Sequence, residues 1–324
     1  MPLATSYIYG VSRLSDGTAA LNSGVKVRIV QPSVPQRDKW RPEKQAEIFR
    51  DHLDLSRRDP AGRVDNLAGI ALLVWPEAAM PFLPLATPEA LAAIADLVPE
   101  GTHLVTGALR IEEQAAVIDG GRRRRDAYNA LMAFDADGRL AALYDKIHLV
   151  PFGEYLPFQA FLERIGLQQL TRMRGGFTAG RSPRPLLSLT GVPVFGGLIC
   201  YEAIFPGRVY PRGERPDWIA TVTNDGWFGD SSGPRQHLDQ ARLRTIETGL
   251  PMARSANTGV SALFDGAGRM IGRVPLYETG VIDRPLPKPL PATVYQRVGD
   301  AVFWVMMAAV FAFGALTPKR LQKL

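Results

Sequence analysis

The chain has 324 residues, of which 46% are hydrophobic and 22% are charged, and this suffices for one large domain or two ordinary ones. Its formal net charge of +6 suits an acidic partner, such as an anionic membrane or a nucleic acid. The single cysteine excludes an internal disulfide framework. The four histidines are scattered, without cysteine partners or an HExxH motif, so we expect no metal and no cofactor.

Strand and helix patterns alternate along the chain. Helical periodicity covers 41–58, 88–97 and 234–248. Strand patterns cover 25–31, 70–75, 103–109, 128–134, 140–144, 192–199, 218–223, 252–256 and 261–264. Turn residues at 135–138 and 265–268 each predict a hairpin. This interleaving predicts an α/β fold in which helices cover the faces of a mixed sheet.

The composition changes toward both ends of the chain, which predicts five segments. The central one is a single folded domain, and the long apolar run near the C-terminus, interrupted only by Asp300, predicts a transmembrane helix. A buried terminal helix is the alternative, although apolar residues on all faces argue against a surface helix. In chain order we expect an N-terminal remnant or linker, the folded domain, a proline-rich linker, the transmembrane helix and a basic tail, at 1–24, 25–284, 285–297, 298–316 and 317–324.

The only cysteine, Cys200, follows the apolar strand 192–199 and precedes a turn. A thiol in that position can attack a carbonyl group if a neighbour removes its proton. A buried structural cysteine is the other interpretation, and this segment alone does not decide between them.

Two more polar residues, Glu77 and Lys146, also come directly after apolar strands. Ligand sites gather where strands end on one edge of an α/β sheet. A carboxylate that accepts the thiol proton, together with an ammonium that stabilises the thiolate and the oxyanion, would make Cys200 a nucleophile. The backbone N–H of Tyr201 would be a second oxyanion donor if a helix begins there. Each residue also has an alternative interpretation when it is taken singly. Glu77 is then an acid at the start of a helix, and Lys146 is a solvated lysine in a loop.

Four segments in order carry a resemblance to a known family: VWPE at 74–77, YDKIHLVPFGEYLP at 144–157, GGLICYEAIFP at 196–206 and TNDGWFG at 223–229. Together they resemble the nitrilase superfamily of carbon-nitrogen hydrolases. VPFGEYLP combined with CYE and an apolar tail resembles the catalytic domain of the apolipoprotein N-acyltransferase family. The resemblance implies a nitrilase-like αββα sandwich with a C-terminal transmembrane helix. It also implies transfer of an acyl chain from a phospholipid donor, through a cysteine thioester, to the α-amine of a diacylglyceryl-lipoprotein acceptor.

The resemblance implies a role for each matching residue. Glu77 is the base, Lys146 the oxyanion stabiliser and Cys200 the nucleophile. The supporting residues are Glu154, Tyr201 and Glu202, and the substrate-binding residues are Trp40, Phe152 and Tyr155. Core packing is an equal alternative for Trp40. The apolar segment from Phe152 to Ile165 predicts a lid at a bilayer surface, with a helix packed on the domain as the alternative.

The family carries a multi-span membrane domain before its catalytic domain, whereas residues 1–22 are too short and polar to cross a bilayer. Three explanations stay open: the chain is a fragment, its Met1 is an internal start, or it works with a separately encoded membrane half. The expected location is the bacterial inner membrane, with the catalytic domain facing the periplasm.

Two rival functions remain. A nitrilase-type amidase or carbamoylase acting on a small C–N substrate shares the triad but needs neither lid nor span. A lipid- or lipoprotein-binding module is the non-enzymatic alternative, and the complete triad argues against it. Nucleic acid is not an expected partner, because the run Arg122–Arg125 follows turn residues and indicates a solvated hairpin tip.

Overall fold

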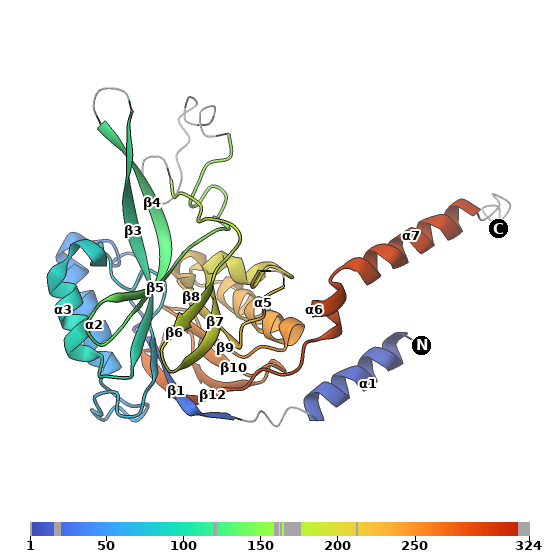
Figure 1. The fold of residues 1–324 in the computed structure, drawn as a ribbon, viewed down its shortest axis with the longest axis horizontal. Coiled ribbons are helices and arrows are strands. Elements are labelled where there is room, and N and C mark those ends of the chain that lie inside the picture. Colours follow the sequence, from blue (N-terminus) through green and yellow to red (C-terminus); the bar gives the residue numbers. More distant parts are fainter. Residues whose placement is uncertain are drawn as a thin grey trace.

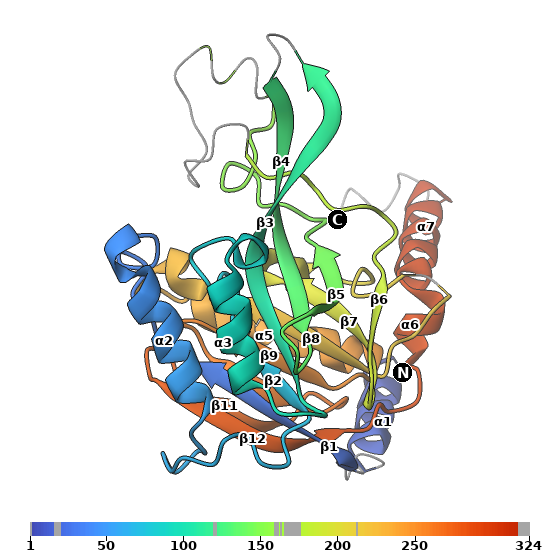
Figure 2. The same cartoon turned by 60° about the vertical axis from the view of Figure 1, so that its left-hand side comes forward.

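The computed structural model describes residues 2–15, 21–118, 122–158, 162, 164, 176–211 and 213–316. Two mixed sheets of six strands each pack face to face, and helices cover their outer faces (Figures 1 and 2). The fold is therefore an αββα sandwich, as the family resemblance implied. The interleaved pattern alone predicted one covered sheet and did not reveal the second.

The first sheet has the order β12-β1-β2-β3-β4-β5. Its strands are β1 (Leu21–Gln31), β2 (Leu72–Val74), β3 (His103–Ile118), β4 (Arg122–Phe134), β5 (Leu140–Asp145) and β12 (Gly280–Pro287). Strands β1, β2 and β3 are parallel and the remaining pairs are antiparallel. All three residues of β2 are buried, because both faces of this central strand are covered.

The second sheet has the order β11-β10-β9-β8-β7-β6. Its strands are β6 (Leu186–Leu189), β7 (Val192–Ile199), β8 (Trp218–Thr223), β9 (Met252–Ala256), β10 (Ser261–Phe264) and β11 (Met270–Val274). Here β7, β8 and β9 are parallel. The two sheets share one apolar core, to which Val27 and Ile29 of the first sheet and Phe195 and Val222 of the second contribute.

The helices pack on the outer faces of the sheets. Helices α2 (Gln45–Ser56) and α3 (Pro88–Leu97) cover the first sheet, and α5 (Gly233–Thr248) covers the second. Helix α3 has Pro at its first position, where a missing N–H costs little. Within the part of the chain that the structure describes, four short 3-10 helices lie in loops: η1 (Pro42–Lys44), η2 (Pro84–Ala86), η3 (Cys200–Ile204) and η4 (Asp225–Phe228).

Both predicted hairpin turns are confirmed. Segment 135–138 joins β4 to β5, and segment 265–268 joins β10 to β11. Each turn ends in a glycine with positive φ, +72° at Gly138 and +78° at Gly268. Strands β3 and β4 also form an antiparallel hairpin that pairs as far as Ile118 and Arg122.

Helices α1 (Pro2–Ser15), α6 (Val294–Val298) and α7 (Ala301–Leu316) lie at the two ends of the chain and project from the same side of the sandwich (Figure 1). The predicted transmembrane helix over 298–316 is not supported. The chain breaks at Gly299, where φ is +55°, so α7 begins only at Ala301. In the ranges that the structure describes, no helix has both the length and the apolarity to cross a membrane. The predicted basic tail, 317–324, lies outside those ranges.

Candidate active site

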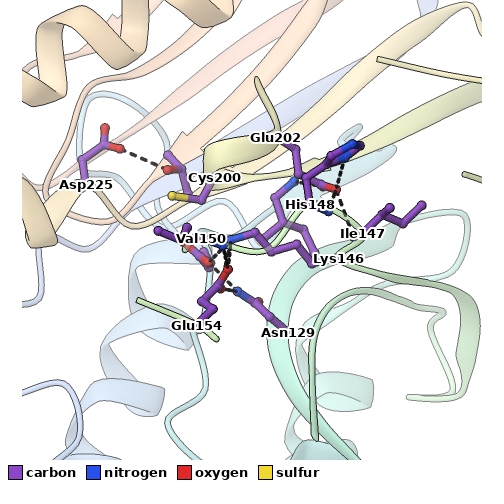
Figure 3. Close-up of polar contacts among 12 residues, drawn as sticks. Asn129, Lys146, Ile147, His148, Val150, Glu154, Cys200, Glu202 and Asp225 are labelled. Carbon is purple, nitrogen blue, oxygen red and sulfur yellow. Dashed lines mark hydrogen bonds and ion pairs between the residues drawn. The ribbon is translucent and has the colours of Figure 1, made fainter. Parts of the chain in front are cut away.

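Three loops at one edge of the sandwich bring together the residues that the sequence singled out. Glu77 follows β2, Lys146 directly follows β5, and Cys200 directly follows β7. Lys146 Nζ lies 3.9 Å from Glu77 Oε1. In Figure 3 the sulfur of Cys200 lies on the side of that residue that faces the Lys146 ammonium. The edge where parallel strands end thus collects an acid, a cation and a thiol.

Lys146 is held by carboxylates on two sides. Its Nζ lies 2.9 Å from each carboxylate oxygen of Glu154. The side chain is 1% exposed, and burial alone would lower the pKa of Lys146. The charges of Glu77 and Glu154 outweigh burial and raise the pKa of Lys146 above its ordinary value, so the group stays an ammonium at neutral pH.

Glu77 is oriented by a residue that the sequence did not single out, Asn129 of β4. Its Nδ2 donates to Glu77 Oε1 at 2.6 Å and to Glu154 Oε1 at 3.0 Å. The other carboxylate oxygen of Glu77, Oε2, is buried without a hydrogen-bond partner among the described residues. Gly107 of β3 allows the loop to pack closely, because a Cβ there would lie 2.5 Å from Glu77 Cα. One oxygen of Glu77 is therefore fixed and the other is left to accept a proton.

Glu154, in the loop after Lys146, is the second carboxylate beside the Lys146 ammonium. Besides its contacts with Lys146 and Asn129, it accepts a hydrogen bond from the N–H of Val150 at 2.8 Å. Glu154 and Glu77 share both Lys146 and Asn129, so the two carboxylates are fixed relative to each other.

A second lysine, Lys39, was also missed by the sequence analysis. Its Nζ donates to the backbone oxygen of Glu77 at 2.8 Å, and the residue is 2% exposed. Burial lowers the pKa of Lys39 to about 8, although the charges of Glu77 and Cys200 act in the opposite direction. Lysines in loops are normally solvated, so only the position of Lys39 beside Trp40 could have drawn attention to it.

Cys200 occupies a sharp turn. Its φ is +48°, in the left-handed region that non-glycine residues rarely adopt and that is common at functional sites. Burial and the Glu77 carboxylate raise the pKa of Cys200 to about 12, against the opposing effects of Lys146 and of a hydrogen bond with Thr223. The resting sulfur is consequently a thiol, which needs a base before it can act as a nucleophile.

Glu202 ties the Cys200 turn to the Lys146 loop. It is 1% exposed, and its two oxygens accept hydrogen bonds at 2.6–3.1 Å from Arg184, from the hydroxyl of Tyr144 and from the backbone N–H groups of Ile147, His148 and Ile199. Burial acts to raise the pKa of Glu202, but Arg184 and the hydrogen bonds outweigh it and hold that pKa well below its ordinary value. Glu202 is thus a charged anchor between two loops of the site.

The other predicted residues lie around this centre. Tyr201 begins the turn after Cys200, and its ring packs edge-on against Phe205 at 5.0 Å. Trp40 is 42% exposed, which argues against ordinary core packing. Phe152 is 56% exposed and Tyr155 is half-buried.

Exposed aromatic side chains adjoin the site on three segments. Phe158 is 86% exposed and shares the Glu154 loop with Phe152. Trp227 and Phe228 of η4 are 53% and 45% exposed, and the sequence reasoning did not select them as site residues. The turn that carries Trp40 contacts the start of η4, because Asn224 Nδ2 donates to Gln36 Oε1 at 2.8 Å. Of the remaining residues predicted for the lid, Leu156 is buried, whereas Phe161 and Ile165 lie outside the described residues.

The site does not have the donor set of a metal centre. Over the described residues, no three side chains of His, Cys, Asp or Glu come together in a way that could hold a metal ion.

Solved structures of low sequence identity share the fold. An amidase from Nesterenkonia sp. superposes with a TM-score of 0.54 at 18% identity, covering 90% of this chain and 99% of the amidase. A variant of that amidase with the acetamide moiety of fluoroacetamide covalently added at its active-site cysteine gives a TM-score of 0.56 at 19% identity, covering 90% of this chain and 99% of the amidase.

The αββα sandwich, with an acid, a lysine and a cysteine at one edge, is the arrangement that the resemblance to carbon-nitrogen hydrolases implied. Residues 26–290 match the family described as Carbon-nitrogen hydrolase. The chain belongs to this family.

Curated relatives match over nearly the whole chain. The apolipoprotein N-acyltransferase of Bradyrhizobium diazoefficiens is 45% identical over 97% of this chain and 58% of the relative. That of Rhodopseudomonas palustris is 45% identical over 95% of this chain and 56% of the relative. That of Brucella melitensis is 43% identical over 89% of this chain and 53% of the relative. The chain thus spans little more than half the length of the relatives it matches.

Proposed function

We propose that this chain is the catalytic part of an apolipoprotein N-acyltransferase. In this proposal it moves an acyl chain from a phospholipid to Cys200 and then to the α-amine of the diacylglyceryl-cysteine at the N-terminus of a lipoprotein. The observation that carries the proposal is the group formed by the buried Glu77 and Lys146 and the partly buried Cys200, in a chain that is 45% identical to such an enzyme over 97% of its length.

In the first step Cys200 is acylated. The free Oε2 of Glu77 accepts the thiol proton as the sulfur attacks the ester carbonyl carbon of the phospholipid. The carbonyl oxygen becomes an oxyanion, which the Lys146 ammonium stabilises. When the tetrahedral intermediate collapses, the C–O bond breaks, and the departing alkoxide of the lysophospholipid takes the proton from Glu77. The thioester remains on Cys200.

In the second step an amine replaces the sulfur. The neutral α-amine of the acceptor attacks the thioester carbonyl, and Lys146 again faces the oxyanion. The C–S bond breaks, the attacking nitrogen loses a proton to Glu77, and that proton passes to the departing sulfur. The raised pKa of Cys200, about 12, favours return to the thiol.

The surroundings of the site support a lipid donor. Exposed aromatic side chains on three adjoining segments present apolar surface next to the catalytic group, namely Trp40, Phe152, Phe158, Trp227 and Phe228. Such surface is unfavourable in water but binds acyl chains and bilayer interfaces. With this donor, we infer that the enzyme works at the bacterial inner membrane, with its catalytic domain on the periplasmic side, beside the membrane domain that the family resemblance implies.

Intact-mass measurement tests the proposal. The detergent-solubilised chain is incubated with phospholipid, and the expected result is a mass gain of one acyl chain on Cys200. Cys200→Ser is the matched control and should gain no acyl chain. An unmodified wild-type chain that releases ammonia from a small amide would overturn the proposal in favour of an amidase.

A further inference from the structure

A buried histidine contacts the backbone of Cys200. His237 of α5 is 3% exposed, and its Nε2 is 3.0 Å from the backbone oxygen of Cys200. Its Nδ1 is 2.8 Å from Oδ1 of Asp225 in η4. In Figure 3 Cys200 lies between Asp225 and Lys146. The catalytic steps described above use neither Asp225 nor His237.

The two ring nitrogens of His237 face different partners: Nε2 faces the Cys200 carbonyl, and Nδ1 faces Asp225 Oδ1 and Arg254 Nη2. A backbone carbonyl can only accept a hydrogen bond, so Nε2 must donate to Cys200. Burial acts to raise the pKa of Asp225, but Arg254 and the hydrogen bond with His237 outweigh it and lower this pKa to about 2, so the carboxylate is ionised at neutral pH.

Asp225 is itself fixed from three directions. Thr223 Oγ1 donates to its Oδ1 at 3.0 Å, and Arg254 Nη2 donates to its Oδ2 at 2.8 Å. Arg254 Nη2 also lies 3.2 Å from His237 Nδ1, so the guanidinium contacts both the carboxylate and the imidazole. Gly259 makes room for this carboxylate, because a Cβ there would lie 2.1 Å from Asp225 Oδ2. The carboxylate that contacts the His237 imidazole is therefore held rigidly, as an orienting histidine requires.

We propose that His237, oriented by Asp225, is a positioning residue for the nucleophile. By holding the carbonyl of Cys200, it stabilises the strained positive-φ turn that directs the thiol toward Glu77 and Lys146. Loss of this bond lets the turn relax toward an ordinary backbone conformation and moves the sulfur away from its base. The inference rests on the proposed function only in taking Cys200 as the group that is acylated.

A simple ester tests this without a lipid substrate. Acylation of Cys200 by p-nitrophenyl butyrate is followed by nitrophenol release and intact mass over a range of ester concentrations. His237→Leu, which cannot donate, should lower the acylation rate constant about 10- to 100-fold with little change in the half-saturating ester concentration. His237→Gln, whose amide N–H can reach the same carbonyl, should recover most of the rate. Asp225→Asn should lose rate in the same direction as His237→Leu.

The matched control is a second buried histidine whose Nε2 also contacts a backbone carbonyl. His103 Nε2 is 3.0 Å from the oxygen of Thr190, at the end of β7 away from Cys200, so His103→Leu should acylate at the wild-type rate. Equal rates for His237→Leu, His237→Gln and the wild type would overturn this inference while leaving the proposed function standing. Normal ester acylation with no acylation from phospholipid would instead overturn the proposed function alone. If His237→Leu does not fold, the comparison of His237→Gln with Asp225→Asn decides: equal wild-type rates in both overturn the inference.

Discussion

Replacing Glu202 with glutamine tests whether a charged anchor holds the Cys200 turn against the Lys146 loop. The substitution keeps the size of the side chain but removes the charge that faces Arg184, whose Nη2 lies 2.9 Å from Glu202 Oε1. An amide nitrogen would also face N–H donors that now meet an oxygen. Because both partners are buried, Arg184 would be left as an uncompensated charge, which costs about 3–5 kcal/mol.

The expected effect is a large loss of stability. For a domain of this size, about 2–4 °C of Tm is lost per kcal/mol, so Glu202→Gln should lower Tm by about 6–20 °C in calorimetry near pH 7. Asp137→Asn is the control, because its ion pair with Arg139 is exposed and should contribute almost nothing. A Tm loss no greater than that of the control would refute the anchoring role.

The pH dependence gives an independent check. The folded-state pKa of Glu202 is depressed, so its stabilisation is complete above the unfolded-state pKa of about 4.3 and is lost as the pH falls through the folded-state pKa. The Tm difference between the wild type and Glu202→Gln should thus be constant from about pH 5.5 to about pH 8, a range that begins about one unit above that value. It should shrink below about pH 4, and a difference that grows as the pH falls would contradict the assignment.

The residues around the site give four further predictions. Glu77→Gln should slow acylation of Cys200 by nitrophenyl ester about 10²- to 10⁴-fold, since it removes the base, and a rate within threefold of the wild type, a threshold of about 0.6 kcal/mol, would exclude that role. Asn129→Leu should slow the same reaction about tenfold by releasing Glu77 Oε1, and unchanged kinetics would mean that this hydrogen bond does not orient the base. Alkylation of Cys200 by iodoacetamide should rise about tenfold per pH unit up to about pH 10, because the thiol pKa is about 12, and a plateau near pH 8 would contradict that value. Gly259→Ala should destabilise the protein by about 1–3 kcal/mol in denaturant titrations, whereas an unchanged midpoint would disprove the close packing on Asp225.

The sequence could predict those parts of the fold and site that have local signals. The turn at 135–138 contains Asp and Gly in a pattern that favours a hairpin, and the structure has it there. Glu77, Lys146 and Cys200 each stand directly after or shortly behind an apolar run, and strand ends on one edge meet in space. The proposed chemistry therefore depends on residues that local patterns bring out.

Other parts depend on contacts between distant segments. Asn129 and Glu77 are 52 positions apart, and only the pairing of β3 with β4 brings the amide to the carboxylate. Lys39 reaches the Glu77 backbone from a loop with no distinguishing pattern. His237 lies on a helix whose other face is solvated, so nothing in its neighbours identifies the Cys200 carbonyl as its partner.

The C-terminal helix shows the limit of composition. Apolarity over 298–316 indicated a continuous helix, but the positive φ of Gly299 divides it. Glycine adopts that conformation without strain, and a hydropathy pattern does not predict the backbone conformation of a glycine.

The most direct test of the account follows one acyl group through both steps. The chain is first loaded from a phospholipid of defined acyl mass and then given a peptide that begins with diacylglyceryl-cysteine, with the masses of both followed in time. We expect the acyl mass to appear on Cys200, to leave it when the peptide is added and to reappear on the α-amine of the peptide. Release of the acyl group as free fatty acid with the peptide unmodified, or equal acylation of Cys200→Ser, would contradict it.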